Sequence, residues 1–279
     1  MLAFELRRPH HAIGEFVATV ELFQPVSPAT FTGVVELAAA KAAELNLPAP
    51  IPTQVFSFNV GGSPGGVSLL QSGQAAAGHQ RFSALGEVEE SLLCDQRSII
   101  FTCRNYISWA ATKPRLLKLF ADLLEAYTRE VPAIANVRLQ YLNEFRAGDG
   151  AVTSVREVLR EGSRWIPPFS SQVEEPWHSH VGLYTEVTDN RRLLGNVNCD
   201  VQRAAPPGST SEVLHLSLFI LAGCYFNIPG APPLVLTPGQ ITSTLDSVLE
   251  TCHDLEKSIL AENVSHAYLK AIGAIDARD

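Results

Sequence analysis

The sequence predicts an α+β fold in which an antiparallel sheet carries long helices on one face. Segments in which apolar and polar residues alternate, as in half-buried strands, are interspersed with segments whose apolar residues recur every three or four positions, as in amphipathic helices. The order strand, helix, three strands, long helix also occurs twice, over residues 13–130 and 137–262. At 279 residues the chain can bury a core without disulfide bonds.

That repeated order predicts an internal duplication of a β-α-β-β-β-α unit. We expect a first half at residues 1–135 and a second at 136–279, packed as one unit because neither half has enough strands to cover its helices. A pseudo-twofold axis then relates the strand at 13–23 to the strand at 137–145. TATA-binding-protein-like and helix-grip-like folds have such a sheet with helices on one face, so we expect one of these topologies.

The first half opens with a strand and a helix. Residues 13–23 are rich in Val, Ile and Phe, and a Gln-Pro pair ends this strand. Ser27 is the expected N-cap of the helix, with Pro28 at its first position and Pro48 beyond its end. The apolar stripe of this helix consists of Phe31, Val34, Val35, Ala38, Ala42 and Leu45.

Three strands and a long helix complete the first half. The strands are expected at residues 54–60, 79–88 and 97–104. A glycine-rich stretch at 61–66 is typical of a loop. From Trp109 to Arg129 the apolar spacing is helical, and Pro114 marks the start of the helix or a kink in it.

The second half begins with residues 137–145, whose strict alternation predicts a half-buried strand closed by the Gly-Asp-Gly sequence at 148–150. A short helix is expected around Val158. Three strands follow, at residues 177–187, 193–202 and 212–226. Asp189-Asn190 favours a hairpin turn between the first two of them.

Residues 237–262 predict the longest helix of the chain. Thr237 and Gln240 have the spacing of a capping box, and Pro238 occupies the first helical position. The face expected to be buried consists of Ile241, Leu245, Val248, Cys252, Leu255 and Ile259.

Charge and composition limit the classes of partner that the protein can bind and the cellular compartment in which we expect it. A formal net charge of −8 opposes binding to nucleic acid, because a phosphate track requires a basic face. The apolar run at 213–226 is too short to cross a bilayer as a helix, so no membrane association is expected. The first ten residues lack the apolar core of a secretory signal, and the five cysteines are odd in number and widely spaced. We therefore expect a cytoplasmic protein without disulfide bonds.

Three motifs carry a resemblance to a known family. They are Trp109-x-x-x-x-Pro114 leading to Leu124-x-x-Tyr127, then Arg138-Leu139-x-Tyr141-Leu142-Asn143, and finally His253-x-x-x-Lys257-x-x-Leu260-x-x-Asn263-Val264-Ser265. Over roughly residues 95–273 the chain resembles a sporadically distributed family of uncharacterised prokaryotic proteins. Members of that family often lie near mobile elements, so the resemblance implies an accessory, immunity or defence role.

A zinc site is the sharpest chemical hypothesis. His178 and His180 stand two residues apart on an expected strand, so they point to the same face and have the spacing of a metal chelate. His215 on a later strand is the candidate third ligand, with Cys199 or Asp200 between. The alternative is that the two histidines are solvent-exposed and bind no metal, so that the protein has no cofactor.

Catalytic signatures are otherwise missing from the sequence. There is no Gly-x-Ser-x-Gly nucleophile motif, and the glycine-rich stretch at 61–66 lacks the lysine of a phosphate-binding loop. No dinucleotide fingerprint follows a strand. The sequence therefore favours a protein that is not an enzyme.

Binding residues are expected near the junction of the two halves. Arg138, Tyr141 and Asn143 stand on the strand that opens the second half, where an anion would use Arg138 and a protein partner would use Tyr141. Alternatively, Arg138 and Arg104 form ion pairs with Glu21 and Glu144 and bind no ligand. Asn143 likewise has a structural alternative, in which its amide hydrogen-bonds the strand to a loop or a helix cap. Trp109 and Phe145, with Tyr141, are candidate liners of a ligand pocket.

Three functions remain open at this point. The leading hypothesis is a non-enzymatic accessory protein that acts by association with a protein partner, a second copy of the chain being one such partner. The alternatives are a small-ligand-binding protein with a pocket between sheet and helices, and a metal-dependent enzyme built on His178, His180 and His215. His253 is expected to lie at the boundary of its helix's apolar stripe.

Overall fold

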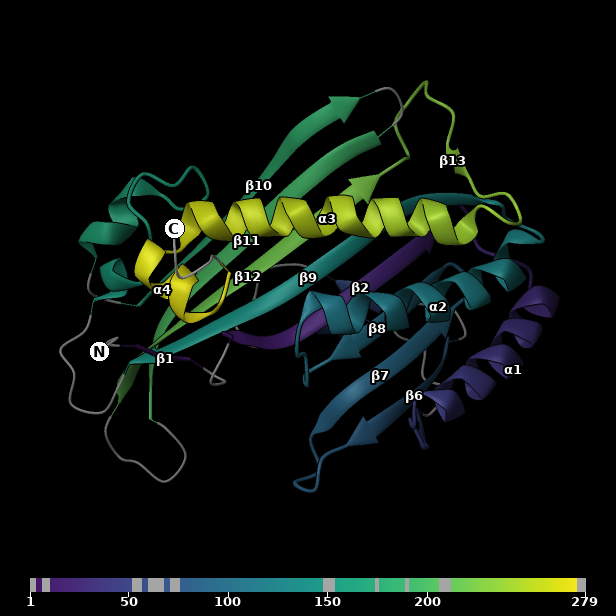
Figure 1. Cartoon of the computed structure of the whole chain (residues 1–279), viewed down its shortest axis with the longest axis horizontal. Coiled ribbons are helices and arrows are strands. Elements are labelled where there is room, and N and C mark those ends of the chain that lie inside the picture. The colour runs from purple at the N-terminus through teal and green to yellow at the C-terminus, as the bar shows by residue number, and fades with distance from the viewer. Residues whose placement is uncertain are drawn as a thin grey trace.

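The computed structural model describes most of the chain as one α+β unit (Figure 1). The described residues are 4–6, 11–51, 57–59, 68–70, 76–147, 154–173, 176–188, 191–205 and 212–274. The α+β class, the large antiparallel sheet and the long helices on one face are confirmed. The predicted loop at 61–66, the Gly-Asp-Gly at 148–150 and the Asp189-Asn190 turn lie outside the described residues.

An 11-stranded sheet, with every described pairing antiparallel, forms the centre of the molecule. Its order is β10-β11-β12-β9-β2-β8-β7-β6-β3, and β1 and β13 pair with opposite ends of β9. The bounds are β10 Trp177–Thr188, β11 Arg191–Ala204, β12 Val213–Tyr225, β9 Ala133–Ala147, β2 Ile13–Leu22, β8 Ser98–Cys103, β7 Val88–Asp95, β6 Ala76–Phe82, β3 Ala49–Ile51, β1 Phe4–Leu6 and β13 Leu234–Val235. Strands β4 (Ser57–Asn59) and β5 (Ser68–Leu70) form a separate pair.

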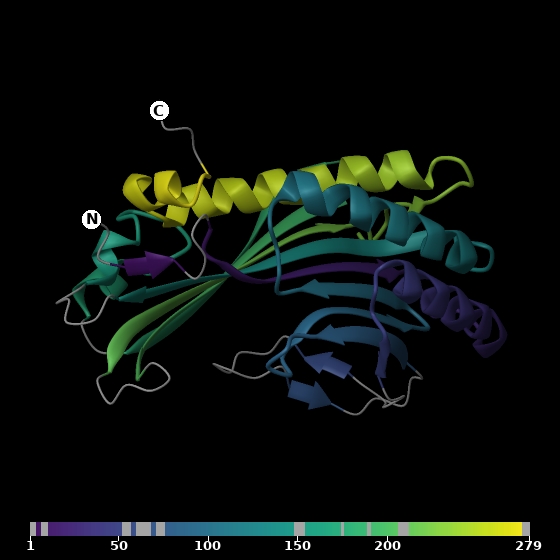
Figure 2. The same cartoon turned by 60° about the horizontal axis from the view of Figure 1, so that its bottom comes forward.

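The long helices lie on one face of this sheet, and no helix of the described residues lies on the other face (Figure 2). They are α1 (Pro28–Glu44), α2 (Trp109–Thr128) and α3 (Ile241–Asn263), with the short α4 (His266–Ala271) and two 3-10 turns at Val155–Glu157 and Pro168–Gln172. Helix α2 packs between α1 and α3, while α3 crosses β9, β11 and β12. No described helix is both long and apolar enough to cross a membrane.

Serine residues cap the N-terminal ends of α1 and α2. The sequence predicts the cap of α1, Ser27, but not that of α2. The Ser27 hydroxyl accepts the Thr30 N–H at 3.3 Å, with Pro28 opening α1. The Ser108 hydroxyl likewise accepts the Ala111 N–H at 3.2 Å, so α2 begins at Trp109. Pro114 therefore lies inside α2 and does not start it.

Glycines with positive φ correct two predicted boundaries. Gly86 has a φ of 81°, and its N–H donates to the Ser83 carbonyl at 3.0 Å, which forms a turn. The strand predicted at 79–88 is therefore interrupted and is instead part of a hairpin of β6 and β7. Gly239 has a φ of 84°, which a right-handed helix does not accommodate, so α3 begins at Ile241 and the capping box at Thr237 is wrong.

The core lies between the sheet and the helices. All five cysteines are buried there with free thiols. One cluster of buried side chains fills the space under α1, α2 and the first half of α3, and a second lies under the end of α3 and α4. Leu255, which is only partly buried, packs against both clusters. At Gly195 in β11 an added Cβ would stand 2.5 Å from the Trp165 ring, so the second cluster requires a glycine at this position.

Replacing Leu245 with Ala should lower the free energy of unfolding by about 2 to 5 kcal/mol, because its side chain is fully buried in the first cluster. Urea denaturation of the two proteins measures the difference. Thr242→Ala, at an exposed position of the same helix, is the control and should change stability by less than about 0.5 kcal/mol. A loss that small for Leu245→Ala would show that α3 is peripheral to the fold.

Candidate functional site

Two of the predicted binding residues meet a histidine at the centre of the fold. Trp109 stands at the start of α2, Tyr141 in the middle of β9 and His253 halfway along α3. The Trp109 and His253 rings stack with centroids 4.5 Å apart and an interplanar angle of 21°. The Tyr141 hydroxyl lies 3.2 Å from Nδ1 of His253. These residues come from three motifs of the family resemblance, which the fold brings together.

A pair of charged contacts fixes Trp109 against α3. Its indole N–H donates to Oε2 of Glu250 at 3.2 Å, and Nζ of Lys113 lies 2.6 Å from the same oxygen. Lys113 also pairs with Asp246 at 2.9 Å. The carboxylates of α3 therefore hold the first turns of α2 in place.

Aromatic rings enclose Tyr141 on its other sides. Phe16 of β2, which pairs with Tyr141 in register, lies 5.0 Å away between centroids, and Tyr106 lies edge-on at 5.9 Å. Tyr141 is fully buried. A side chain at this position packs the core and does not reach a surface partner, so replacing it should lower stability as well as any binding.

Below this cluster lies a buried acid that the sequence reading did not single out. Glu256 is 3 % exposed, and Oε2 of its carboxyl group is 3.9 Å from Nδ1 of His253. Helical spacing could have revealed it, since Glu256 falls four residues after Cys252 and three before Ile259 on the predicted buried stripe.

Burial keeps both members of this pair neutral near pH 7. Desolvation raises the pKa of Glu256 to about 8. It lowers the pKa of His253 to about 4, with the Lys257 charge acting in the same direction. The contact is therefore a carboxylic acid beside a neutral imidazole and not an ion pair. Such a pair can hold and pass a proton, but the rings around it leave no described cavity for a substrate.

The other two predicted binding residues lie apart from this cluster. Tyr141 and Asn143 point toward the helices, whereas Arg138 points to the opposite, helix-free face, because successive residues of a strand alternate. Asn143 is buried and its amide donates to the Leu218 carbonyl at 3.4 Å, which ties β9 to β12. Arg138 has a nitrogen 3.6 Å from Glu21. The predicted binding residues of β9 therefore lie on opposite faces of the sheet and do not form one site.

The described residues show no pocket shared by Trp109, Tyr141 and Phe145, because Phe145 lies in a different part of the core. Phe145 is fully buried in the second core cluster, where its ring meets Tyr268 edge-on at 6.0 Å. The described pocket between sheet and helices lies elsewhere, beside the start of α3.

The three histidines share the helix-free face but are spread over it. His178 and His180 lie on β10, and His215 lies on β12, two strands away, which corresponds to about 10 Å. The His180 ring contacts the Asn196 amide at 2.9 Å, and Nε2 of His215 is 3.8 Å from Glu144. The described residues contain no group of three or more His, Cys, Asp or Glu that could hold a metal ion. The predicted ligand set is not brought together.

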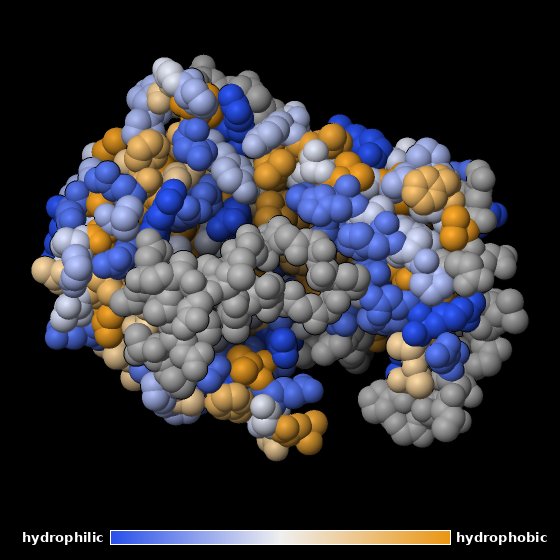
Figure 3. Space-filling model, turned by 180° about the vertical axis from the view of Figure 1, so that it is seen from behind, coloured by the Kyte–Doolittle hydropathy of each residue, from blue (hydrophilic) through white to orange (hydrophobic). Residues whose placement is uncertain are grey.

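The same face ends at a long edge strand that the sequence reading did not identify as a site. β10 is the last strand of the sheet and pairs only with β11. Tyr184 on this strand is 59 % exposed, and the Arg192 guanidinium lies 5.8 Å from the centroid of its ring. Figure 3 shows this side of the molecule, where hydrophilic and hydrophobic residues are interspersed.

Buried polar atoms without a hydrogen-bond partner gather on β10 and β11. They are Nε1 of Trp177, Oγ of Ser179, Nε of Arg192 and the Oδ1 atoms of Asn196 and Asn198. Buried polar atoms are normally paired, so this concentration marks a region whose hydrogen bonds the described residues do not complete.

Comparison with known protein families and with curated proteins gives no match to this chain.

Stability should fall as the pH rises from about 6.5 to 8, and Glu256→Gln should remove this fall. The folded chain holds the Glu256 proton up to about pH 8, whereas a glutamate with the ordinary pKa of 4.5 has lost it in the unfolded chain. The unfolded state therefore binds fewer protons in this interval, and stability drops by about 1.4 kcal/mol per pH unit. His253 has the opposite slope, but only below its ordinary pKa of 6.5.

Urea denaturation at several pH values measures this slope for both proteins. Asp254→Asn, at an exposed position of the same helix, is the control and should keep the fall. An unchanged slope in Glu256→Gln would show that Glu256 is ionised in the folded chain.

Proposed function

We propose that this chain is a non-enzymatic accessory protein that associates with a protein partner, and that the partner adds an extended strand to the outer edge of β10. The observation that carries the proposal is the free edge itself. β10 has 12 residues, and its only described pairing is with β11. An edge strand presents a row of N–H and C=O groups to which another chain can bond.

The sequence of β10 lacks two of the features that usually prevent such pairing. Edge strands are commonly short, or carry lysine or proline to discourage association. β10 contains neither residue, and its one charged side chain is Glu186, just beyond a bulge after Tyr184. Seven residues before that bulge, from residue 177 to 183, stay in regular register with β11.

Side chains beside the edge have the character of a protein interface. Tyr184 and Arg192 are of the residue types that contribute most to interface energies. Asn196 and Asn198 lie one strand inward on the same face as Tyr184, which makes this face polar beside the edge. An edge strand and an adjoining polar and aromatic face together give a partner both backbone and side-chain contacts.

Charge restricts the class of partner. The formal net charge of −8 disfavours nucleic acid and favours a neutral or basic polypeptide. The accessory, immunity or defence role implied by the family resemblance agrees with a protein of this kind.

The order of the strands supports a further proposal, an internal duplication. Strands β9, β12, β11 and β10 follow one another on one side of the sheet centre, and β2, β8, β7 and β6 follow one another on the other side.

Gly182→Lys should weaken capture of the partner at least about tenfold, because a lysine on the edge strand opposes strand addition. Gly182 is exposed, and a Cβ there meets only the Asn196 side chain at an ordinary distance of 3.5 Å, so the fold should tolerate the change. Gln202→Lys places the same charge on the same face one strand inward and is the control, which should bind normally.

The complex recovered from the native organism can be tested directly by hydrogen exchange. Backbone amides on the outer edge of β10 should exchange fast in the free chain and slowly in the complex. A chain that recovers no stoichiometric partner at any salt concentration, or a partner retained by Gly182→Lys without protection of residues 177–188, would overturn the proposal.

A further inference from the structure

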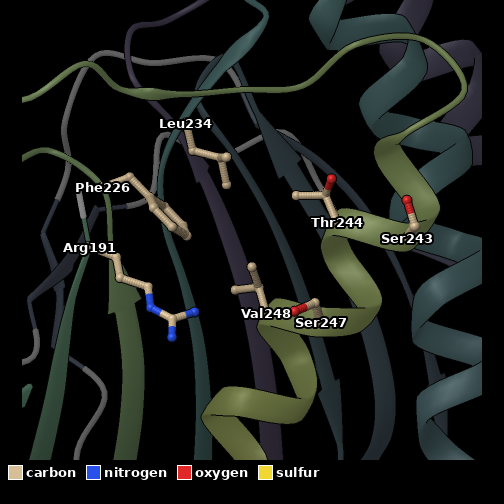
Figure 4. A pocket seen from close by; sticks show the side chains of 7 residues that line it. All are labelled: Arg191, Phe226, Leu234, Ser243, Thr244, Ser247 and Val248. Carbon is tan, nitrogen blue, oxygen red and sulfur yellow. The ribbon is translucent and has the colours of Figure 1, made fainter. Parts of the chain in front are cut away.

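A cavity of about 420 Å³ lies between the helices and the sheet, at the edge of the second half (Figure 4). Arg191 at the start of β11 bounds it on one side and the first turns of α3 on the other. Phe226 follows β12, and Leu234 belongs to β13. Its volume is within the range that small-molecule sites occupy in proteins.

The walls of this cavity combine apolar side chains with hydroxyl groups. Phe226, Leu234 and Val248 supply the apolar surface, while Thr244 and Ser247 of α3 supply hydroxyl groups. The Arg191 side chain extends from β11 toward α3, below the Phe226 ring (Figure 4). It therefore brings a positive charge to a space whose lining is partly apolar and partly polar.

Arg191 differs in its surroundings from the arginines that form ion pairs. Arg97, Arg104 and Arg164 each form an ion pair with a glutamate at 3.0 Å or less. For Arg191 the structure shows neither a hydrogen bond nor an ion pair with a described residue, and none of the described residues that line the cavity is acidic. Among the described residues nothing competes for this guanidinium, so its donors can bind an added anion.

The start of α3 adds to the positive potential. The helix has 23 residues, and its first residue, Ile241, follows an N-cap, Gln240, that makes no side-chain hydrogen bond to the helix. The N-terminal end of a helix carries a partial positive charge that favours an anion nearby. Thr244 and Ser247, in the first two turns, face the same cavity.

We infer that this cavity binds a small monocarboxylate with an apolar body, such as a short or medium-chain acid. The planar fork of Arg191 matches the two oxygens of a carboxylate, and Phe226, Leu234 and Val248 receive the apolar part. One cation against apolar walls suits a single negative charge better than a phosphate dianion. This site lies on the helix-covered side of the sheet, apart from the proposed protein-binding edge, so it adds a ligand to that function.

Octanoate is the probe for this site, titrated calorimetrically into the full chain. It should bind, and Arg191→Gln should weaken binding about tenfold or more because a charge-assisted hydrogen bond is lost. Arg192→Gln is the matched control, since the adjacent arginine points to the helix-free face, and it should bind octanoate as the unaltered chain does. Octanol lacks the carboxylate that Arg191 would bind, and inorganic phosphate lacks the apolar body. Each should bind at least about tenfold more weakly than octanoate.

Ser247→Trp gives an independent test that does not depend on the arginine. Residue 247 is exposed at the margin of the cavity, so the indole can fill the space without disturbing the core, and octanoate binding should be lost while the Tm is kept. Equal binding of octanol, equal binding of phosphate, or octanoate binding that survives both Arg191→Gln and Ser247→Trp would overturn the inference. Loss of octanoate binding in these variants with partner capture unchanged would separate this site from the edge of β10.

Discussion

The antiparallel pairing of β2 with β9 is the interaction on which the rest of the structure depends. It joins the part of the sheet formed by β9 to β12 to the part formed by β2, β8, β7 and β6, with Phe16 opposite Tyr141 and Val20 opposite Val137 in the register. Because side chains alternate along a strand, this register alone decides which residues face the helices and which face the helix-free side. A shift by one residue would place Arg138 in the core and Tyr141 outside it.

Helix α3 turns this sheet into one packed unit. Leu255 packs against both core clusters, and Glu250 holds Trp109 at the start of α2. The neutral pair of His253 and Glu256 lies at the same crossing, where two polar groups are buried at a cost in solvation. The contact of His253 with Tyr141 and that of His253 with Glu256 favour one placement of the helix over others that apolar packing alone would allow.

Both proposed binding regions lie at the margin of the second half, where the sheet ends. Among the described strands, β10 has a neighbour on one side only, so its outer backbone groups are not paired by another described strand. Arg191 and Arg192 are adjacent at the start of β11 and point to opposite faces of the sheet, because successive residues of a strand alternate. One arginine therefore serves the helix-covered cavity and the other stands beside Tyr184.

The sequence by itself determined the local features of this protein: the Ser27 cap, the alternation that puts Tyr141 and Asn143 on one side of β9, and the helical stripe that contains Leu245. Each of these depends on residues a few positions apart, which a pattern can reveal. Only the tertiary structure decided that Tyr141 meets His253, 112 residues away, that β10 is an edge, and that Arg191 lines a cavity. Strand order and side-chain contacts between distant segments follow from how the whole chain buries its apolar surface, and no local pattern of residues carries that information.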